Sequence, residues 1–439
     1  MTSSNKTARE LQEKIEQKKA TVAVIGLGYV GLPMCLEFAR SGFSVLGIDL
    51  DEKRIAKLKA GESYILDVSA DQLKAVRPYF DVASTYESLT AADAIIICVP
   101  TPLRKTKDPD LSFILSATGQ IKRYIKRGQI VILESTTYPG TTDEIILPEL
   151  HSTGLKAGED FFLAFSPERI DPGNSSYNIR NTPKIVGGFS EDCGILAELL
   201  YSCITQKVVR VSSTKSAEMV KLLENTFRAI NIGMVNEVAI MCDKLGIDTW
   251  EVIDAAATKP FGFMPFYPGP GLGGHCIPID PHYLAWKLKT LNYSARFIEL
   301  AGEINSSMPA YVVTKISDAL NHESKSVKGS TIFVLGVAYK KNSNDVRESP
   351  ALDIINLLKE KGAKVLYHDP HVPYLRTDSI ELCSQKLDPS SLQSADCLVI
   401  ITDHSLFEWQ SIVNHSRLIV DTRNATRDVK AGQCRIVKL

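Results

Sequence analysis

One cysteine lies in a stretch of the chain that is rich in glycine and proline. Residues 267–283 read YPGPGLGGHCIPIDPHY, with four glycines and four prolines around Cys276. Glycine at this density lets a backbone fold closely around a ligand, and a thiolate presented there is a nucleophile. The same residues also fit an inert, buried cysteine beside a glycine-rich turn. The neighbouring His275 lacks the paired Cys/His spacing of zinc sites, so we expect no metal.

Polar residues at helical spacing are candidates to act with this thiol. Asp280 follows Cys276 by four residues, and Lys221 and Asn225 are also four apart, which places them on one helix face. Asn236 lies eleven residues beyond Asn225 and extends the same face. Apolar residues border this polar stripe, so it is either solvated or directed at a site.

A glycine-rich turn near the start of the chain predicts a dinucleotide site. GLGYVG (26–31) directly follows an apolar strand and opens a helix, so phosphates would meet the free N–H groups of that helix. An acid ends the next strand, where it can bond a ribose hydroxyl and repel a 2′-phosphate, which favours NAD over NADP. A structural turn without a ligand is the alternative. The expected cofactor contacts here are Gly26, Gly28, Tyr29, Val30, Gly31, Asp49 and Arg54.

Two further turns follow predicted parallel strands at their carboxyl ends. They contain VPTP (99–102) and STT (135–137), and ligands bind at this edge of open α/β sheets. Either turn alone would be unremarkable. We expect Pro100, Thr101, Ser135 and Thr136 beside the cofactor.

The elements around these motifs predict an α/β protein with two Rossmann-like, doubly wound parallel sheets joined by a central helical domain. Apolar runs of strand length alternate with helices in both ends of the chain, and a long helical pattern runs from 213 to 245. We expect a helical extension at 1–20, solvated, then domains at 21–212, 213–321 and 322–439. The last domain has Gly336 but no GxGxxG, so it suits a nucleotide other than NAD.

The composition limits the partners of the chain. Its 439 residues carry a formal net charge of −1, without the basic surface that nucleic acid or an anionic membrane would require. No apolar run is long enough to span a membrane. Nine cysteines without regular spacing fit a reducing cytoplasm, where we expect the protein.

Taken together, seven motifs in order resemble the UDP-glucose/GDP-mannose dehydrogenase family over essentially the whole chain from about residue 20. They are GLGYVGLP (26–33), VPTP (99–102), EST (134–136), SPER (166–169), the pair Lys221 and Asn225, GLGGHCIPID (271–280) and NDVRESP (344–350). The sequence PGPGLGGHCIPIDPHYL is similar to the branch that acts on UDP-N-acetylhexosamines. UDP-N-acetyl-D-glucosamine is the expected sugar, with the galacto and manno sugars or UDP-glucose as alternatives.

The resemblance implies that the C6 alcohol of the sugar is oxidised to a carboxylate with reduction of two NAD. Cys276 would attack the intermediate aldehyde, and a thioester would form and be hydrolysed. Lys221 and Asn225 would stabilise the oxyanion. Asp280 and Thr136 would position and activate water, and Glu168 would serve the acid–base steps near the sugar.

The family pattern also implies residues that bind the nucleotide sugar. Lys340 matches a substrate lysine, and Arg347 matches an arginine on the cofactor side. The sequence departs from the glucose branch at two positions. Pro172, beside Asp171, stands where that branch has a second glutamate, and Tyr267 stands where it has a lysine. The full set expected around the sugar is Glu168, Arg169, Lys221, Asn225, Tyr267, Gly273, His275 and Lys340.

Two other functions fit parts of the sequence. A two-electron hydroxyacid dehydrogenase shares the α/β-then-helical plan but needs no cysteine. A catalytically silent nucleotide-binding module needs neither Cys276 nor the Lys221 and Asn225 pair. The long helix carries apolar residues on more than one side, which favours a homodimer through this helix.

Overall fold

The computed structural model describes residues 5–65, 68–104, 108–170, 176–274 and 276–439. The chain forms two compact units. Unit 1 contains residues 1–224 and 282–293, and unit 2 contains residues 225–281 and 294–439. The boundary falls inside one long helix, so this helix contributes its first residues to unit 1 and the rest to unit 2.

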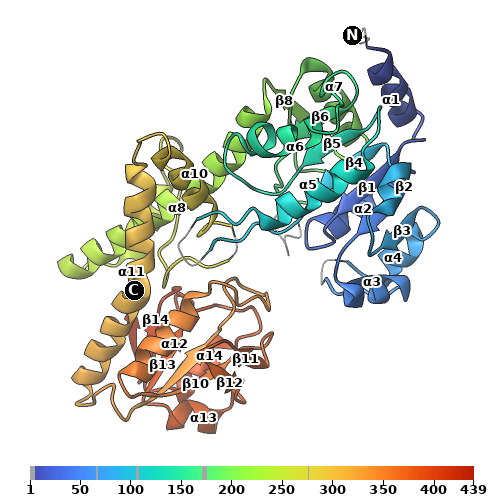
Figure 1. The fold of residues 1–439 in the computed structure, drawn as a ribbon. Coiled ribbons are helices and arrows are strands. Elements are labelled where there is room, and N and C mark those ends of the chain that lie inside the picture. Colours follow the sequence, from blue (N-terminus) through green and yellow to red (C-terminus); the bar gives the residue numbers. More distant parts are fainter. Residues whose placement is uncertain (1–4, 66–67, 105–107, 171–175, 275) are drawn as a thin grey trace. The chain divides into compact units, whose positions relative to one another are not determined.

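Unit 1 is built on an eight-stranded sheet in the order β3-β2-β1-β4-β5-β6-β7-β8 (Figure 1). The first six strands of this order are parallel, whereas β7 runs antiparallel to β6 and parallel to β8. The first residue of β7 therefore lies at the edge where β4, β5 and β6 end. The strands are β1 (Thr21–Ile25), β2 (Ser44–Ile48), β3 (Phe80–Ala83), β4 (Ala94–Ile97), β5 (Ile130–Leu133), β6 (Phe162–Phe165), β7 (Lys184–Gly188) and β8 (Val208–Val211).

Helices cover both faces of this sheet because its central strands are apolar on both sides. Val22 and Val24 pack in the core that holds α1, α2, α3, α4 and α7, whereas Ala23 and Ile25 pack in the core that holds α5 and α6. The helices are α1 (Lys6–Glu16), α2 (Gly31–Arg40), α3 (Glu52–Lys59), α4 (Ala70–Val76), α5 (Ser112–Tyr124), α6 (Leu147–His151) and α7 (Glu191–Ser202), with a 3₁₀ turn η1 (Glu87–Ala91) and a π turn η2 (Thr142–Ile146).

The first helix is part of the core. Ala8, Leu11 and Ile15 of α1 are at most 2% exposed and pack in the same cluster as β1 and α7. The expectation of a solvated extension was wrong. The spacing of these three residues, three and four apart, places them on one face of a helix, and the charges between them obscured that pattern.

The middle of the chain is helical, as expected from residue 213 onward. The predicted helix at 213–245 is α8 (Thr214–Leu245), and the other helices here are α9 (Thr249–Ala257), α10 (Asp280–Lys289) and α11 (Arg296–His322). No helix within the described residues is long and apolar enough to cross a membrane.

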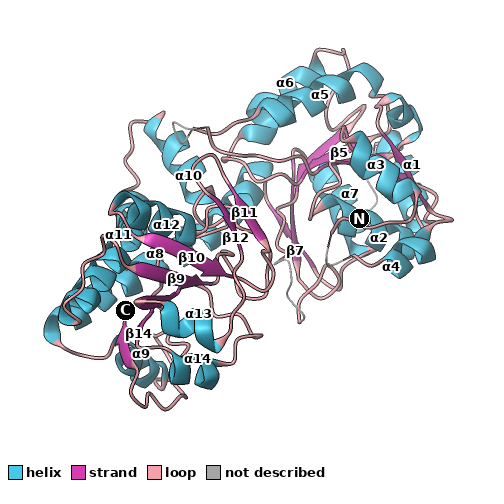
Figure 2. Cartoon of the chain, turned by 90° about the horizontal axis from the view of Figure 1, so that it is seen from below, coloured by secondary structure: helices cyan, strands magenta, loops and turns pink. Residues whose placement is uncertain are grey.

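Unit 2 contains a second parallel sheet in the order β10-β9-β13-β14-β15, and Figure 2 shows its strands β10, β9 and β14. Helices α11 and α12 pack on one face and α13 and α14 on the other, so the predicted fold class is confirmed. The elements are β9 (Thr331–Leu335), α12 (Pro350–Glu360), β10 (Lys364–His368), a hairpin of β11 (Tyr374–Arg376) and β12 (Glu381–Cys383), α13 (Pro389–Ser394), β13 (Cys397–Ile400), α14 (Trp409–His415), β14 (Leu418–Asp421) and β15 (Arg435–Lys438).

Candidate active site

The glycine turn after β1 has the geometry of a phosphate cradle. Gly26 has φ of +93°, and a Cβ on Gly31 would lie 1.9 Å from the Gly26 carbonyl oxygen, so only glycine fits at both positions. A Cβ on Gly28 would meet nothing within 4 Å, which leaves open space beside the turn. Helix α2 starts next to Val30 without a side-chain cap, and its first N–H groups suit a pyrophosphate.

The acid after β2 holds this turn in place. Asp49 Oδ2 accepts a hydrogen bond from the Leu27 N–H at 2.9 Å and pairs with Arg54 at 3.3 Å. Tyr64 was not expected here; its hydroxyl donates to the Leu27 carbonyl at 2.6 Å, and the Arg54 guanidinium lies over its ring. A carboxylate has about four acceptor positions, so Asp49 keeps capacity for a ribose hydroxyl. These residues fit an NAD.

The turns after β4 and β5 meet at the same sheet edge. Ser135 Oγ donates to the Val99 carbonyl at 2.7 Å, which ties the two turns together. The Thr101 carbonyl accepts a hydrogen bond from the Tyr283 hydroxyl at 2.6 Å. Thr136 is half-buried beside Ser135, and Pro100 is exposed, as is Tyr29 in the glycine turn.

Asp280 links the cysteine loop to the long helix. The Cys276 carbonyl accepts hydrogen bonds from the Ile279 and Asp280 N–H groups at 3.0 and 2.8 Å, and α10 starts at Asp280. The Asp280 carboxylate accepts a hydrogen bond from Asn225 Nδ2 at 2.5 Å, with both side chains buried. The Cys276 thiol belongs to a half-buried residue.

The polar stripe of α8 is buried, which excludes the solvated alternative that the sequence left open. Lys221, one turn before Asn225, is 8% exposed, and Asn236 is fully buried. Asn236 Oδ1 accepts a hydrogen bond from the Gly269 N–H at 2.9 Å, and its Nδ2 donates to Asn305 at 2.8 Å. Asn236 and Asn305 therefore hold the start of the glycine-rich stretch.

The glycines before Cys276 close against the chain itself. A Cβ on Gly273 would lie 2.7 Å from the Tyr339 Cβ, and one on Gly274 would lie 2.8 Å from the Tyr339 ring. The Gly274 N–H also donates to the Arg347 carbonyl at 3.1 Å. The sequence predicts glycines that surround a ligand, but two of them instead accommodate the loop after β9, which carries Lys340 and Arg347.

A buried charged cluster lies at the carboxyl edge of the sheet in unit 1. Lys184 Nζ, at the start of β7, is 2.8 Å from Glu134 Oε2 and 3.9 Å from Glu168 Oε2. The Tyr201 hydroxyl donates to the other Glu134 oxygen. Burial and the nearby Glu168 raise the pKa of Glu134 to about 7, although Lys184 opposes this. Burial raises the pKa of the Cys98 thiol, after β4, well above its ordinary value, and the negative charge of Glu134 raises it further.

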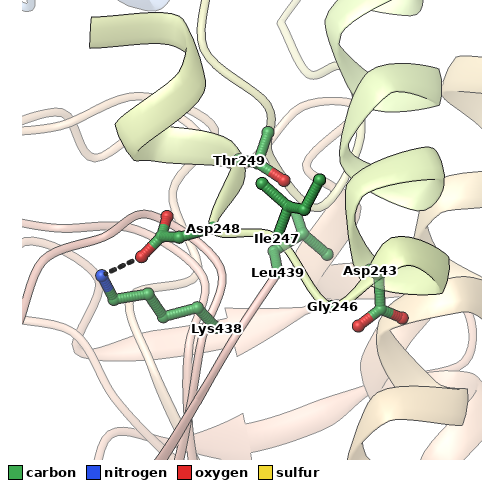
Figure 3. A pocket seen from close by; sticks show the side chains of 7 residues that line it. All are labelled: Asp243, Gly246, Ile247, Asp248, Thr249, Lys438 and Leu439. Atoms are coloured by element: carbon green, nitrogen blue, oxygen red, sulfur yellow. Dashed lines mark hydrogen bonds and ion pairs between the residues drawn. The ribbon is translucent and has the colours of Figure 1, made fainter. Parts of the chain in front are cut away.

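The remaining expected residues lie outside these clusters. Arg169 pairs with Glu224 at 2.6 Å. Tyr267 stacks on Trp250 and donates to Asp254 at 2.8 Å. His275, Asp171 and Pro172 lie outside the described residues. A shallow pocket in unit 2 is lined by Asp243, Gly246, Ile247, Asp248, Thr249, Lys438 and Leu439, and it contains none of the expected residues (Figure 3).

The glycine turn yields a first prediction. Gly28→Ala should fold normally, because its Cβ meets no protein atom within 4 Å, but should weaken NAD binding about tenfold or more by blocking the approach of the pyrophosphate. Gly119→Ala on α5, where a Cβ also meets nothing, is the matched control. Binding titrations with NAD measure both. Unchanged affinity in Gly28→Ala would contradict the assignment of this turn.

The Glu134 cluster yields a pH prediction. Folding raises the Glu134 pKa from 4.5 to about 7. The protonated carboxyl therefore contributes its full share to the free energy of unfolding below pH 4.5, and this contribution is lost as the pH rises through 7. Relative to Glu134→Gln, the wild type should lose up to about 3 kcal/mol between pH 5 and pH 8. Thermal unfolding midpoints of the two proteins at both pH values measure this. A difference that stays constant would refute it.

Three family models cover most of the chain. The NAD binding domain of the UDP-glucose/GDP-mannose dehydrogenase family matches residues 20–205, the central domain of this family matches residues 215–307, and its UDP binding domain matches residues 333–428. The NAD binding match includes the glycine turn and the turns after β4 and β5. The UDP binding match includes the loop that carries Lys340.

Individual relatives agree with these matches. The chain is 36% identical over 419 residues to UDP-N-acetyl-D-mannosamine dehydrogenase of Pyrococcus horikoshii, covering 94% of this chain and 97% of the relative. It is 39% identical over 359 residues to UDP-N-acetyl-D-glucosamine 6-dehydrogenase of Pseudomonas aeruginosa, covering 81% and 84%. The solved UDP-D-ManNAc dehydrogenase structure from Pyrococcus horikoshii superposes with a TM-score of 0.87 at 35% identity, covering 95% and 98%.

The glycine turn, the two α/β sheets and the three ordered matches lead to one conclusion. The chain belongs to the UDP-glucose/GDP-mannose dehydrogenase family and is an NAD-dependent UDP-sugar dehydrogenase.

Proposed function

We propose that this chain oxidises C6 of a UDP-N-acetylhexosamine, with UDP-N-acetyl-D-glucosamine favoured, to the uronic acid through a thioester on Cys276. The observation that carries the proposal is the hydrogen bond between buried Asn225 and buried Asp280, four residues after Cys276. This contact brings two groups suited to oxyanion and water chemistry next to the loop of a cysteine. A protein that only binds nucleotides would not need that combination.

The first half of the proposed reaction uses Glu168 and Cys276. Bound NAD supplies a hydride acceptor for each of the two oxidations. Glu168 takes the proton of the C6 hydroxyl in the first oxidation; its Oε2 has no hydrogen-bond partner among the described residues, so it retains acceptor capacity. The Cys276 thiolate then adds to the aldehyde carbon, which forms a C–S bond and places negative charge on the former carbonyl oxygen.

The second half of the reaction uses the helix face and Asp280. Lys221 and Asn225 stabilise the oxyanion of the thiohemiacetal until its second oxidation to the thioester. Water, oriented by Thr136, attacks the thioester carbon and gives its proton to Asp280. The C–S bond breaks, the electron pair returns to sulfur, and the uronic acid leaves.

Substrate recognition is the second part of the proposal. We assign the cofactor to residues 21–212, the helical segment to 213–321 and the nucleotide sugar to 322–439, with Lys340 on the nucleotide. Arg169, Tyr267 and His275 are assigned to the sugar and Arg347 to the cofactor side, as the family resemblance implies, whereas Gly273 accommodates Tyr339. A tyrosine at 267 in place of a lysine, together with Arg169 and His275, suits an acetamido group better than glucose.

UDP-N-acetyl-D-mannosamine is the second candidate substrate. It is favoured by the similarity over 94% of the chain to the Pyrococcus horikoshii enzyme of that name, whereas the relative with 39% identity bears the UDP-N-acetyl-D-glucosamine name. The two sugars differ only in configuration at C2.

Parallel assays with four sugars test the proposal. UDP-GlcNAc, UDP-GalNAc, UDP-ManNAc and UDP-glucose are each incubated with NAD, and NADH is counted per sugar consumed. We expect two NADH per molecule and fastest turnover with UDP-GlcNAc. Faster turnover of UDP-ManNAc would select the second candidate, and equal or faster turnover of UDP-glucose would refute the acetamido assignment. One NADH with accumulating aldehyde would refute the double oxidation.

We also propose that the protein is a homodimer through α8. Helices α8 and α11 approach closely at Gly233 and Ala301, and exposed apolar side chains flank this crossing, among them Met234, Phe297 and Leu300. A second copy of the chain would cover them. Light scattering should give about 97 kDa, twice the 48.3 kDa of one chain, and Phe297→Asp should lower it. A mass of one chain in the wild type would refute the dimer.

A further inference from the structure

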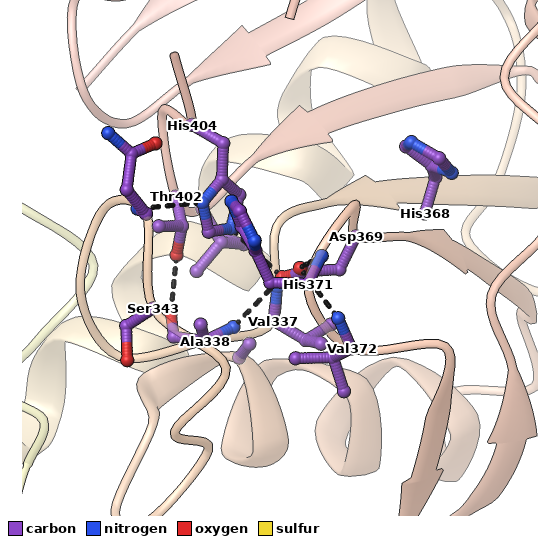
Figure 4. Close-up of polar contacts among 12 residues, drawn as sticks. Val337, Ala338, Ser343, His368, Asp369, His371, Val372, Thr402 and His404 are labelled. Carbon is purple, nitrogen blue, oxygen red and sulfur yellow. Dashed lines mark hydrogen bonds and ion pairs between the residues drawn. The ribbon is translucent and has the colours of Figure 1, made fainter. Parts of the chain in front are cut away.

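A buried aspartate and histidine lie at the carboxyl edge of the sheet in unit 2 (Figure 4). The side chains of Asp369, after β10, and His404, after β13, are both 0% exposed, with His404 Nε2 3.0 Å from Asp369 Oδ2. Asp369 also accepts hydrogen bonds from four backbone N–H groups, at Val337, Ala338, His371 and Val372. These donors and His404 lower the pKa of Asp369 against the effect of burial, so it is ionised.

The other nitrogen of His404 fixes the loop after β9. Nδ1 of His404 accepts a hydrogen bond from the Asn342 N–H at 3.0 Å. Because Nδ1 accepts, the proton of the neutral ring is on Nε2, where it donates to Asp369. The imidazole is therefore a bridge between a buried anion and the loop that carries Lys340.

The residues on both sides of His404 also form hydrogen bonds and an ion pair with the same loop. Thr402 Oγ1 donates to the Ala338 carbonyl at 2.6 Å, and Asp403 pairs with Lys341 at 3.3 Å. The Ser405 N–H donates to Asn342 Oδ1 at 2.9 Å, and Asn342 Nδ2 donates to Ser405 Oγ at 2.9 Å. Four consecutive residues, 402–405, thus each hold the segment 338–342, in which Lys340 lies.

Unit 1 uses the same arrangement for another purpose. Gly26 and Gly336 both have positive φ, and each donates its N–H to the strand end before the acid, at 2.8 and 2.9 Å. Asp49 and Asp369 each accept from the N–H of the residue after that glycine, at 2.9 and 2.7 Å. However, the Asp49 side chain is 10% exposed, whereas Asp369 is enclosed and occupied by His404.

This difference indicates what the second carboxylate does. In unit 1 the acid can reach a ribose hydroxyl of a dinucleotide. In unit 2 the imidazole takes that position, so the acid cannot contact a ligand, and its charge instead orders the loop. The same loop contacts the segment before Cys276, because Tyr339 lies against Gly273 and Gly274.

We propose that His404 is a positioning residue: by bridging Asp369 and the Asn342 N–H, it holds the 338–348 loop in the conformation that binds the UDP part of the substrate. The inference rests on the proposed function for the role of Lys340. It adds to that function a residue that contacts neither substrate nor cofactor and sets nucleotide affinity through the loop.

His404→Phe in the full-length protein tests the proposal. Phenylalanine keeps the ring packing of His404 beside His371 and Phe407 but removes both hydrogen bonds. The matched control is His371→Phe, since His371 is a neighbouring ring whose Nε2 is buried and has no hydrogen-bond partner among the described residues.

Binding of UDP and of NAD is measured by calorimetry, apart from any turnover. We expect His404→Phe to weaken UDP binding about tenfold with NAD binding unchanged, which corresponds to about 1.4 kcal/mol. KM for the nucleotide sugar should rise more than kcat falls. His371→Phe should change UDP affinity less than about twofold. Hydrogen exchange at Asn342 should accelerate only in His404→Phe.

Several results would overturn the proposal. The first is that His404→Phe binds UDP as tightly as the wild type does. The second is that UDP and NAD binding fall equally, which would indicate general destabilisation. If His404→Phe does not fold, His404→Gln carries the test, because the glutamine amide nitrogen can still donate to Asp369 from the position of Nε2, whereas the Asn342 N–H loses its acceptor. UDP affinity unchanged in that variant would also overturn the proposal. A wild type that does not bind UDP would instead refute the proposed function.

Discussion

The hydrogen bond between Asn225 and Asp280 is the contact on which the candidate site depends. It joins the middle of α8 to the first residue of α10, and the turn just before α10 contains Cys276, whose carbonyl caps that turn. Both side chains are buried, so the loss of either leaves an unpaired polar group and costs about 1–3 kcal/mol. The hydrogen bond between the two helices therefore fixes the polar stripe of α8 relative to the cysteine loop.

A second constraint recurs in both units. In each, an acid at the end of the second parallel strand bonds the backbone of the turn after the first strand, at Asp49 and at Asp369. The turn is held rigid by an anion, and what differs is the access to that anion. The partly exposed Asp49 can contact a cofactor, whereas Asp369, which His404 encloses, can only hold the loop in place. The buried pair Lys184 and Glu134 supports the same sheet edge in unit 1.

The sequence was most informative where the pattern is local. Continuous apolar runs identified β1, β4 and β5, and helical periodicity identified α8 nearly to the residue. Strands such as β8 were missed because Val208–Val211 is partly exposed and has no continuous apolar run. The burial of α1 was missed because its three core residues stand among many charges.

The candidate site shows the same limit. Spacing placed Lys221 and Asn225 on one helix face and Asp280 beside Cys276. It could not reveal the pairs Lys184–Glu134 or His404–Asp369, whose members are 50 and 35 residues apart, because no local pattern signals a contact made across a sheet. It also could not show that the glycines at 273 and 274 accommodate Tyr339.

The most direct test of the central claim measures the mass of the peptide that contains Cys276. The Asp280→Asn variant, in which hydrolysis of the thioester should be slowed, is mixed with NAD and UDP-N-acetyl-D-glucosamine, and the reaction is quenched with acid before the mass is measured. The account predicts a covalent uronyl adduct on Cys276, and no acid from a Cys276→Ala variant that still binds NAD. Acid formed at the wild-type rate by Cys276→Ala would contradict it.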